Sequence, residues 1–318
     1  MIRSPPMRGA RAYRIVCVLA LSGLMHFALP FMKGLNAQQQ DAEVLSGDFE
    51  ERLRVSGLER SFRLHVPATY YERSAAVPLV VVIHGAYSSG AQIAATSAFS
   101  PLADQNRFLV AYPNSIAPRG GIAAWNAGGC CGFARDTHVR DSLFLRRMIA
   151  WITEIADVDP GRIYVVGYSN GGMMAYRMAC QYPDLFSGIA VVAGSREIEP
   201  CELSHAMSLM VVHGTADRNV PYGGGRGSES PFSRSKQSVR SSMRPWLRRA
   251  GCLRLPILSA RADLTVRGCQ DPSGRTQIRL FSLIGGRHVW PPSVDGVPTA
   301  RRIFEFLEES NSRVRPGS

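Results

Sequence analysis

The residues best suited to chemistry lie in the stretch 167–171, which reads Gly-Tyr-Ser-Asn-Gly. An apolar run at 162–166 precedes it, and a segment of helical character at 172–180 follows it. Small residues two places either side of a serine allow a tight strand-to-helix turn that exposes the hydroxyl above a sheet, where a base can reach it. The five-residue pattern alone is weak, but its place between a strand and a helix strengthens it. We therefore predict that Ser169 is a nucleophile.

An acid and a base follow this serine at suitable places. A serine hydroxyl becomes a good nucleophile only when a base takes its proton and an anion orients that base. Asp217 lies in the turn after an apolar strand, and His288 lies on a glycine-rich loop after the last expected strand. All three groups then leave the carboxyl edge of the sheet, where open α/β sheets bind ligands. We predict the triad Ser169, Asp217 and His288, with Asp271 and Glu202 as alternative acids.

Two backbone amides are candidates for an oxyanion site. A tetrahedral intermediate needs preorganised N–H donors for its negative oxygen. One expected donor is the amide of Asn170, directly after the nucleophile, and the other comes from the turn after the apolar run 78–83. In this turn we predict Ala86, with Tyr87 as the alternative.

Apolar runs and helical spacings alternate along the chain. Period-two alternation predicts a half-buried hairpin, and continuous apolar runs predict strands that are covered on both faces. The expected strands are residues 49–55, 60–67, 78–83, 107–112, 162–166, 188–193, 208–212 and 277–283, and the expected helices are 89–105, 139–156, 170–182 and 300–309. This order predicts an α/β fold with a mostly parallel central sheet, helices on both faces and an N-terminal β-hairpin. We expect a single catalytic domain over residues 48–310.

Residues 223–251 interrupt this alternation, and we interpret them as a basic insertion or lid. The segment contains Lys236 together with Arg226, Arg234, Arg240, Arg244, Arg248 and Arg249. The whole chain has a formal net charge of +12. However, no stretch interleaves its arginines with aromatic residues in a nucleic-acid-binding motif. We expect a solvated arginine-rich surface and no nucleic-acid partner.

The first 37 residues have the features of a secretion signal. Four arginines precede an apolar run at 15–29, which is short for a membrane span, and Ala37 offers a small residue for cleavage. An uncleaved anchor is the alternative. We expect a flexible leader at 38–47, a tail at 311–318, and export to the extracellular space or the periplasm without a stable membrane anchor.

Six of the seven cysteines follow the expected signal peptide. An even number of cysteines in an exported protein suggests disulfides. A helix that begins at Asn170 places Cys180 about three turns down, near the bottom of the sheet. Cys201 precedes a strand at the same end of the sheet. We therefore expect a Cys180–Cys201 bond.

The other four cysteines form two close pairs. Cys252 and Cys269 flank a short segment, and we expect a bond between them. Cys130 and Cys131 are adjacent, so a vicinal bridge and a pair of free thiols both remain open. No cysteine or histidine cluster has zinc-ligand spacing, and we expect no metal site.

Several segments occur together in one order along the chain. They are Val82-Ile83-His84-Gly85, Tyr112-Pro113-Asn114, Trp125-Asn126-Ala127-Gly128-Gly129-Cys130-Cys131-Gly132, Gly167-Tyr168-Ser169-Asn170-Gly171-Gly172-Met173-Met174, His213-Gly214-Thr215-Ala216-Asp217 and His288-Val289-Trp290-Pro291. This set resembles the secreted esterases related to polyhydroxybutyrate depolymerases, feruloyl esterases and acetylxylan esterases, over residues 48–310. The resemblance implies an α/β-hydrolase that cleaves carboxylic esters through an acyl-enzyme without a cofactor. It maps the triad onto the same Ser169, Asp217 and His288.

The sequence departs from the pattern of these esterases near two functional segments. Arg140 stands beside Asp141 where such proteins usually have paired acids, and Arg287 replaces the glycine that commonly precedes the histidine. Together with the basic segment 223–251, these changes bear on the substrate. A basic rim would favour acidic or uronate-bearing polysaccharide.

Four aromatic residues are expected to border the substrate pocket. Trp125 and Trp290 lie on loops where they would stack on a feruloyl ring or a sugar face, with ordinary packing as the alternative. Tyr87 and Tyr168 neighbour the expected oxyanion turn and the nucleophile. We predict a secreted serine carboxylesterase for a small or polymeric ester. A serine peptidase, an acyltransferase and a catalytically silent wall-binding protein are the alternatives, and the sequence indicates neither a cofactor site nor an oligomer interface.

Overall fold

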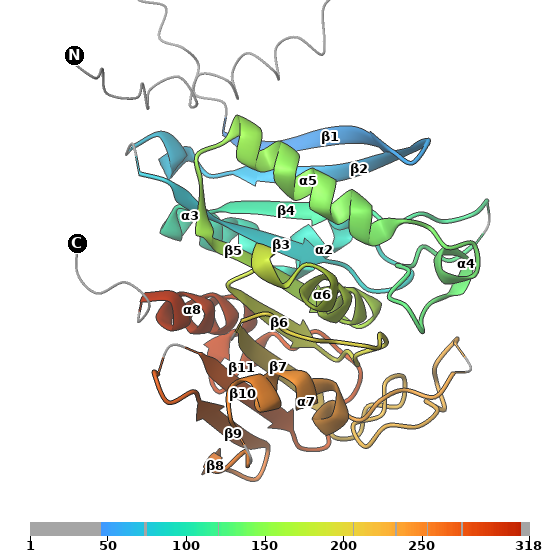
Figure 1. Ribbon diagram of the computed structural model, residues 1–318, viewed down its shortest axis with the longest axis vertical. Coiled ribbons are helices and arrows are strands. Elements are labelled where there is room, and N and C mark those ends of the chain that lie inside the picture. Colours follow the sequence, from blue (N-terminus) through green and yellow to red (C-terminus); the bar gives the residue numbers. More distant parts are fainter. Residues whose placement is uncertain are drawn as a thin grey trace, which may run out of the picture.

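The computed structural model describes residues 46–312 except 73–74, 120, 206, 233, 253 and 275. The expected signal peptide, nearly all of the expected leader and residues 313–318 of the expected tail lie outside the described residues. The first described strand begins at Gly47, and the last helix ends at Ser312. Figure 1 shows one layer of sheet with helices packed against it.

A ten-stranded sheet forms the centre of the described chain, in the order β1-β2-β4-β3-β5-β6-β7-β10-β9-β8. In chain order the strands are β1 Gly47–Val55, β2 Leu58–Val66, β3 Val77–Ile83, β4 Leu109–Pro113, β5 Val158–Tyr168, β6 Gly188–Val192, β7 Ser208–Gly214, β8 Ile257–Ala260, β9 Leu264–Gln270 and β10 Gln277–Leu283. Six neighbouring strands of the sheet pair in parallel, in the order β4-β3-β5-β6-β7-β10. Antiparallel pairs extend both ends of the sheet: β1 and β2 at one edge, β8 and β9 at the other.

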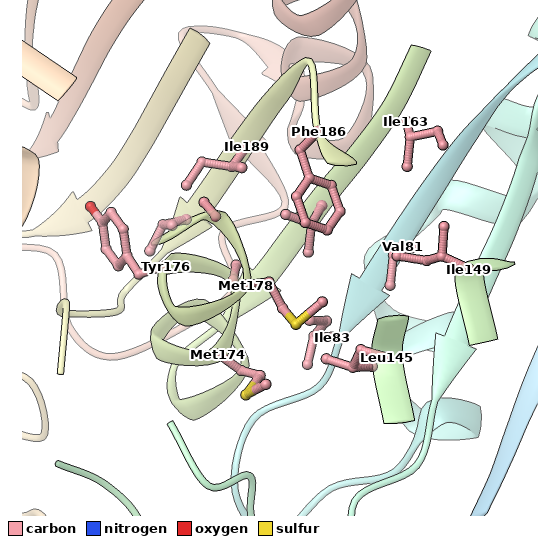
Figure 2. Packing of buried hydrophobic residues seen from close by; sticks show 14 of the residues in the cluster. Val81, Ile83, Leu145, Ile149, Ile163, Met174, Tyr176, Met178, Phe186 and Ile189 are labelled. Atoms are coloured by element: carbon pink, nitrogen blue, oxygen red, sulfur yellow. The ribbon is translucent and has the colours of Figure 1, made fainter. Parts of the chain in front are cut away.

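Strand β3 illustrates why this sheet is covered on both faces. All seven of its residues are buried. Leu79, Val81 and Ile83 belong to one hydrophobic cluster, whereas Val80 and Val82 belong to a second cluster. Because successive side chains of a strand point to opposite faces, an unbroken apolar run needs a helical layer on each side. Figure 2 shows the first of these clusters, in which β3 packs against helices α5 and α6.

Six helices supply the two layers. The first cluster includes side chains of α5 (Asp141–Ile155), α6 (Asn170–Gln181) and α7 (Val239–Arg249). The second includes side chains of α2 (Gly90–Ser97), α3 (Phe99–Asn106) and α8 (Thr299–Ser312). The smaller elements are α4 (Gly132–Asp136), the 3-10 turns at Ala68–Glu72 and Pro183–Leu185, and the two-stranded sheet of β11 (Ser293–Val294) and β12 (Val297–Pro298). None of the helices in the described residues is long and apolar enough to span a membrane.

The structure differs from the sequence prediction in several segments, among them β8 and β9, which were not expected. Residues 239–249, expected within an insertion, form α7, and Val239, Met243 and Trp246 are buried against the sheet. The amphipathic spacing of these three residues outweighs the many arginines, which lie mostly on the solvent side. The helix expected at 89–105 is two helices, because Ala98 between them has a left-handed backbone with φ of 61°.

Three disulfides join described residues. Cys180, near the end of α6, is bonded to Cys201 in the segment before β7, with their Cα atoms 4.9 Å apart. Cys252, just after α7, is bonded to Cys269 of β9 across 6.4 Å between Cα atoms. The adjacent Cys130 and Cys131 form a vicinal bridge, which resolves the alternative that the sequence left open.

Candidate active site

The turn between β5 and α6 has a strained backbone at Ser169 and is closely packed on both sides. Ser169 has φ of 56° and ψ of −121°, a strained conformation for a residue with a side chain. A Cβ added at Gly167 would overlap the carbonyl of Gly171, and one added at Gly171 would overlap the carbonyls of Ile83 and His84. The two glycines are therefore required because the start of α6 approaches both the end of β5 and the turn after β3. This close approach holds the Ser169 hydroxyl above the sheet.

The structure brings together the serine, the histidine and the acid that the sequence indicated. The Nε2 atom of His288 lies 2.8 Å from the Oγ atom of Ser169. The Nδ1 atom of the same ring lies 2.7 Å from the Oδ2 atom of Asp217. Neither Asp271 nor Glu202 takes this place, since Asp271 accepts a bond from the Thr276 amide in its own turn and Glu202 is exposed.

The carboxylate of Asp217 is buried and held from several directions. Its Oδ1 atom accepts hydrogen bonds from the amides of Asn219 (2.9 Å) and Val220 (2.8 Å). A second imidazole, that of His213, lies 3.3 Å from Oδ2. Burial alone would raise the pKa of Asp217, but the hydrogen bonds from His213, His288 and the Val220 amide outweigh it and hold this pKa below its usual range. Asp217 is therefore suited to remain an anion while it orients His288.

The turn after β3 packs against the nucleophile, and one of its two candidate amides is already bonded elsewhere. A Cβ at Gly85 would lie 3.2 Å from the Cβ of Ser169, so this turn packs directly against the serine. The amide of Tyr87 donates to the carbonyl of Ala123 at 2.9 Å and is thus engaged. Ala86 lines the cavity at Ser169, as does Asn170 at the start of α6. The geometry favours the Ala86 and Asn170 amides over that of Tyr87.

Comparison with known proteins agrees with the observed fold. The sequence model of the alpha/beta hydrolase fold matches residues 78–225. NocK of Nocardia uniformis subsp. tsuyamanensis, a protein named as an esterase, is 28% identical over 80% of this chain and 80% of its own length. Feruloyl esterase B of Piromyces equi is 29% identical over 67% of this chain. The solved acetyl xylan esterase from Aspergillus awamori has a TM-score of 0.57 at 16% identity, covering 82% of this chain and 99% of that one.

The chain has the α/β-hydrolase fold, and these relatives are named as esterases. The match to the feruloyl esterase covers 40% of that protein's length, so the hydrolase spans well under half of this larger relative. The match to a poly(3-hydroxyalkanoate) depolymerase of Paucimonas lemoignei, 31% identical, covers 30% of its length. The substrates in the names of these relatives therefore describe those larger proteins and are not assigned to this chain by the match.

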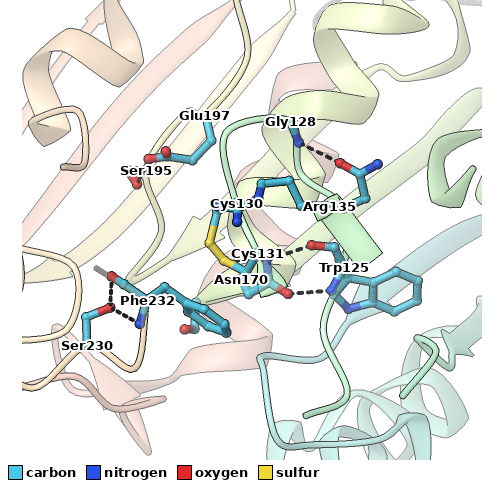
Figure 3. The surroundings of a disulfide bond; sticks show 12 residues. Trp125, Gly128, Cys130, Cys131, Arg135, Asn170, Ser195, Glu197, Ser230 and Phe232 are labelled. Atoms are coloured by element: carbon cyan, nitrogen blue, oxygen red, sulfur yellow. Dashed lines mark hydrogen bonds between the residues drawn. A yellow bond between two sulfur atoms is a disulfide. The ribbon is translucent and has the colours of Figure 1, made fainter. Parts of the chain in front are cut away.

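Trp125 has a different place in the hydrolase from the one expected. Its side chain is fully buried, and it is absent from the cavity wall. Its indole N–H donates to the carbonyl of His84 at 2.9 Å, and its backbone exchanges hydrogen bonds with the side-chain amide of Asn170 (Figure 3). The expectation that Trp125 stacks on substrate is thus wrong. It instead fixes the turn that carries Ala86 against the start of α6.

A buried ion pair between Arg60 and Asp141 holds the loop that carries Trp125 and Asn126. Arg60 of β2 donates to Oδ1 of Asp141 at 2.7 Å, and Oδ2 of Asp141 accepts from the Asn126 amide at 2.8 Å. Burial raises the pKa of Asp141, although Arg60 and the Asn126 amide oppose the rise. Arg140, the departure from the esterase pattern, is exposed, so the structural role of the paired position falls to Asp141 alone.

A cavity of about 350 Å³ opens at the triad. It is lined by Ala86, Tyr87, Cys131, Tyr168, Ser169, Asn170, Met173, Asn219, Val220, Glu229, Ser230, Pro231, Phe232, Lys236 and His288. Of the four aromatic residues expected here, Tyr87 and Tyr168 line the cavity. Trp290 packs behind Tyr168, with ring centroids 6.3 Å apart, and is not part of the wall.

The sequence did not identify one wall of the cavity. Residues 219–236, which join β7 to the approach of α7, supply nearly half of the lining residues, among them Phe232 and Lys236. The Phe232 ring lies against Gly132, and Figure 3 shows Phe232 near the Cys130–Cys131 bridge. The arginine-rich composition marked this segment as unusual, but nothing in it indicated which side chains face the cavity. Among the described residues, no group of three or more His, Cys, Asp and Glu side chains is placed to hold a metal ion.

Proposed function

We propose that this protein is a serine carboxylesterase that works through a covalent acyl-enzyme. The observation that carries the proposal is the continuous chain of contacts from Ser169 Oγ through the His288 ring to Asp217, with 2.8 Å and 2.7 Å between the bonding atoms. A base within hydrogen-bond reach of a serine, itself oriented by a buried anion, is the arrangement that activates a hydroxyl for acyl transfer.

Each residue has a defined role in the proposed reaction. Ser169 Oγ attacks the ester carbonyl carbon, while His288 Nε2 takes the hydroxyl proton and Asp217 stabilises the imidazolium. The amides of Asn170 and Ala86 donate to the oxyanion of the tetrahedral intermediate. The C–O bond to the alcohol then breaks, and His288 returns the proton to the leaving oxygen. Water, deprotonated by His288, then attacks the acyl carbon. The C–O bond to Ser169 breaks as His288 returns this proton to Oγ, which releases the acid and regenerates the free serine.

The relatives and the cysteines support a substrate class and a location for this proposed enzyme. Relatives named for feruloyl, acetylxylan and polyhydroxyalkanoate esters support a substrate of one of these types, small or polymeric. Three disulfides in the described residues are typical of an oxidising compartment, which supports export through the predicted signal peptide 1–37.

Labelling with a fluorophosphonate tests the nucleophile. We expect the wild-type protein to be labelled and Ser169→Ala to lose the label, because the probe reacts only with an activated serine. Ser230→Ala is the matched control, since Ser230 lines the same cavity without a histidine beside it, and it should retain the label. An unlabelled wild-type protein, or a label that persists in Ser169→Ala, contradicts the proposal.

Turnover then identifies the ester. We expect hydrolysis of p-nitrophenyl esters, with methyl ferulate, acetylated xylan and short-chain polyhydroxybutyrate as the panel that separates the three substrate types. Ser169→Ala should lower kcat by about 10⁶-fold, as removal of a triad serine does in other hydrolases. Hydrolysis of peptide substrates in preference to every ester of the panel would overturn the assignment.

A further inference from the structure

Lys236 is unusual because lysine is rare in this chain. The sequence contains 37 lysines and arginines, and Lys33 and Lys236 are its only lysines. Lys33 lies in the predicted signal peptide, so Lys236 would be the one lysine of the exported protein. Its backbone is fixed by two hydrogen bonds with Gly225, one from the Lys236 amide at 2.8 Å and one to its carbonyl at 2.9 Å. These two bonds hold the backbone of Lys236 in one position within the loop.

The side chain of Lys236 is buried in the wall of the cavity that contains Ser169 and His288. The residue is 5% exposed, and its ammonium nitrogen has no hydrogen-bond partner among the described residues. The buried Arg60 and Arg196 differ in this respect, since Arg60 donates to Asp141 at 2.7 Å and Arg196 to Glu199 at 2.7 Å. Lys236 is thus a buried cation in the catalytic cavity whose bonding capacity the surrounding residues do not use.

The charged groups near Lys236 leave it without a close counter-ion. Glu197 attracts it over a longer distance, but the Glu197 carboxylate accepts a bond from the Ser195 hydroxyl at 2.6 Å. Glu229, which also lines the cavity, lies 3.3 Å from Arg218. Arg135 and Arg234 add positive charge in the vicinity. Burial lowers the pKa of Lys236, which Glu197 opposes.

We propose that Lys236 binds a carboxylate of the substrate, so that the cavity selects esters whose acyl or alcohol part is anionic. The inference rests on the proposed esterase function and narrows its substrate class. A carboxylate would supply the missing acceptor and neutralise a charge that is costly to bury alone. A cavity of about 350 Å³ with Phe232 and Met173 in its wall has room for the carbon chain between that carboxylate and the reacting carbonyl.

Two matched substrate pairs test the proposal and locate the carboxylate. The mono-p-nitrophenyl ester of adipic acid against p-nitrophenyl hexanoate varies the charge of the acyl part. p-Acetoxybenzoate against its methyl ester varies the charge of the part that leaves. We expect Lys236→Met to lower the ratio of kcat/KM, anionic over neutral, by about tenfold to a hundredfold for at least one pair, the range of a charge-assisted hydrogen bond. The pair that responds identifies which part carries the carboxylate.

Two further variants separate the ammonium from general electrostatics. Lys236→Arg keeps the charge and should retain more of the preference than Lys236→Met. Arg240→Met removes the same charge from an exposed position on α7 that does not line the cavity, and should change the ratio less than threefold. An unchanged ratio in Lys236→Met, or a parallel fall for both members of each pair, overturns the proposal.

A binding measurement keeps this test independent of turnover. We expect adipate to raise the Tm of the full-length wild-type protein and to have a smaller effect on Lys236→Met, whereas adipamide should not discriminate between them. If the protein hydrolysed no ester but adipate still stabilised it through Lys236, the esterase function would fail and the carboxylate site would stand. Hydrolysis of neutral esters without a Lys236-dependent effect of adipate would support the esterase function and overturn the carboxylate site.

Discussion

The two walls of the catalytic cavity are built in different ways. The wall of the nucleophile turn consists of backbone segments in direct contact, with Ser169 and Asn170 fixed by the glycines around them and by buried Trp125. The wall formed by residues 219–236 is a loop of mostly half-buried and exposed residues. A Cβ added at Gly223 or Gly225 would meet nothing within 4 Å, whereas one added at Gly227 would overlap the carbonyl of Asn219. Buried polar groups on the first wall have partners, whereas Lys236 on the second does not.

This difference separates two kinds of specification. In the proposed reaction, the nucleophile wall must place the Ser169 hydroxyl and the proposed oxyanion amides within tenths of an ångström, which packed backbone and satisfied hydrogen bonds achieve. In the proposed carboxylate site, the loop wall recognises a group on the substrate, for which a side chain of suitable charge is enough. We therefore expect changes in the first wall to abolish the reaction or the fold, and changes in the second to alter selectivity.

After Ser169→Ala, the largest effect is expected for Asp217→Asn. The substituted side chain still accepts the bonds from the Asn219 and Val220 amides, so the turn is retained, but it no longer orients His288 as an anion does. We expect kcat to fall by about 10⁴-fold with little change in KM, as in other triads that lose the acid. Steady-state kinetics with a p-nitrophenyl ester measures it.

Two matched controls address the alternative acids. Glu202→Gln and Asp271→Asn make the same chemical change at the two other carboxylates that the sequence allowed. Both should leave kcat within about twofold of the wild-type value, as expected for surface substitutions remote from the reacting atoms. A large fall in either of them, with Asp217→Asn nearly unaffected, would reassign the acid.

A pair of glycine substitutions compares the two walls directly. An alanine at Gly171 would overlap the carbonyls of Ile83 and His84, whereas one at Gly223 meets nothing within 4 Å. We expect Gly171→Ala to lower the free energy of unfolding by about 1–3 kcal/mol and to reduce activity, because the turn must shift. Gly223→Ala should change stability by less than about 0.5 kcal/mol. Urea denaturation with disulfides intact measures both, and equal tolerance at the two sites would erase the distinction.

The sequence predicted those parts of the site that depend on local pattern. The apolar run of β3 and the motif around Ser169 place the turns, because a strand covered on both faces and a glycine-flanked serine each have a local signature. Trp125 could not be placed in this way, since its burial depends on Asn170 and His84, which are distant in the sequence. Lys236 is a similar case. The sequence shows a rare lysine at this position, but only the folded cavity shows that its ammonium group has no hydrogen-bond partner among the described residues.

Other misses have a local signal that was outweighed. Helix α7 carries Val239, Met243 and Trp246 at helical spacing, yet its arginines gave the segment the composition of an exposed loop. The antiparallel strands β8 and β9 were missed for a different reason. All four residues of β8 are exposed, so no apolar run distinguishes this edge strand from a loop.

The effect expected for Lys236→Met on stability has the opposite sign from that expected for Gly171→Ala. Lys236→Met should raise the free energy of unfolding at pH 7, by about 1–3 kcal/mol, because it removes a buried ammonium without a close partner. Folding lowers the pKa of Lys236, so the protonated side chain is disfavoured in the folded state relative to the unfolded one. This cost is fully present below the folded-state pKa and disappears as the pH rises through the ordinary lysine value of about 10.4.

Urea denaturation of the wild-type protein and Lys236→Met at pH 7 and pH 10 measures this difference. We expect the variant to be more stable at pH 7 and the gap to narrow at pH 10, with adipate narrowing it at pH 7 by stabilising the wild type. Arg240→Met, which removes an exposed charge, should show no such pH dependence. A residue that lowers stability in the free protein, but gains its missing hydrogen-bond partner when a ligand binds, is typical of a functional position. If Lys236→Met were less stable at both pH values, Lys236 would have the same structural role as the nucleophile wall, and the contrast between the two walls would fail.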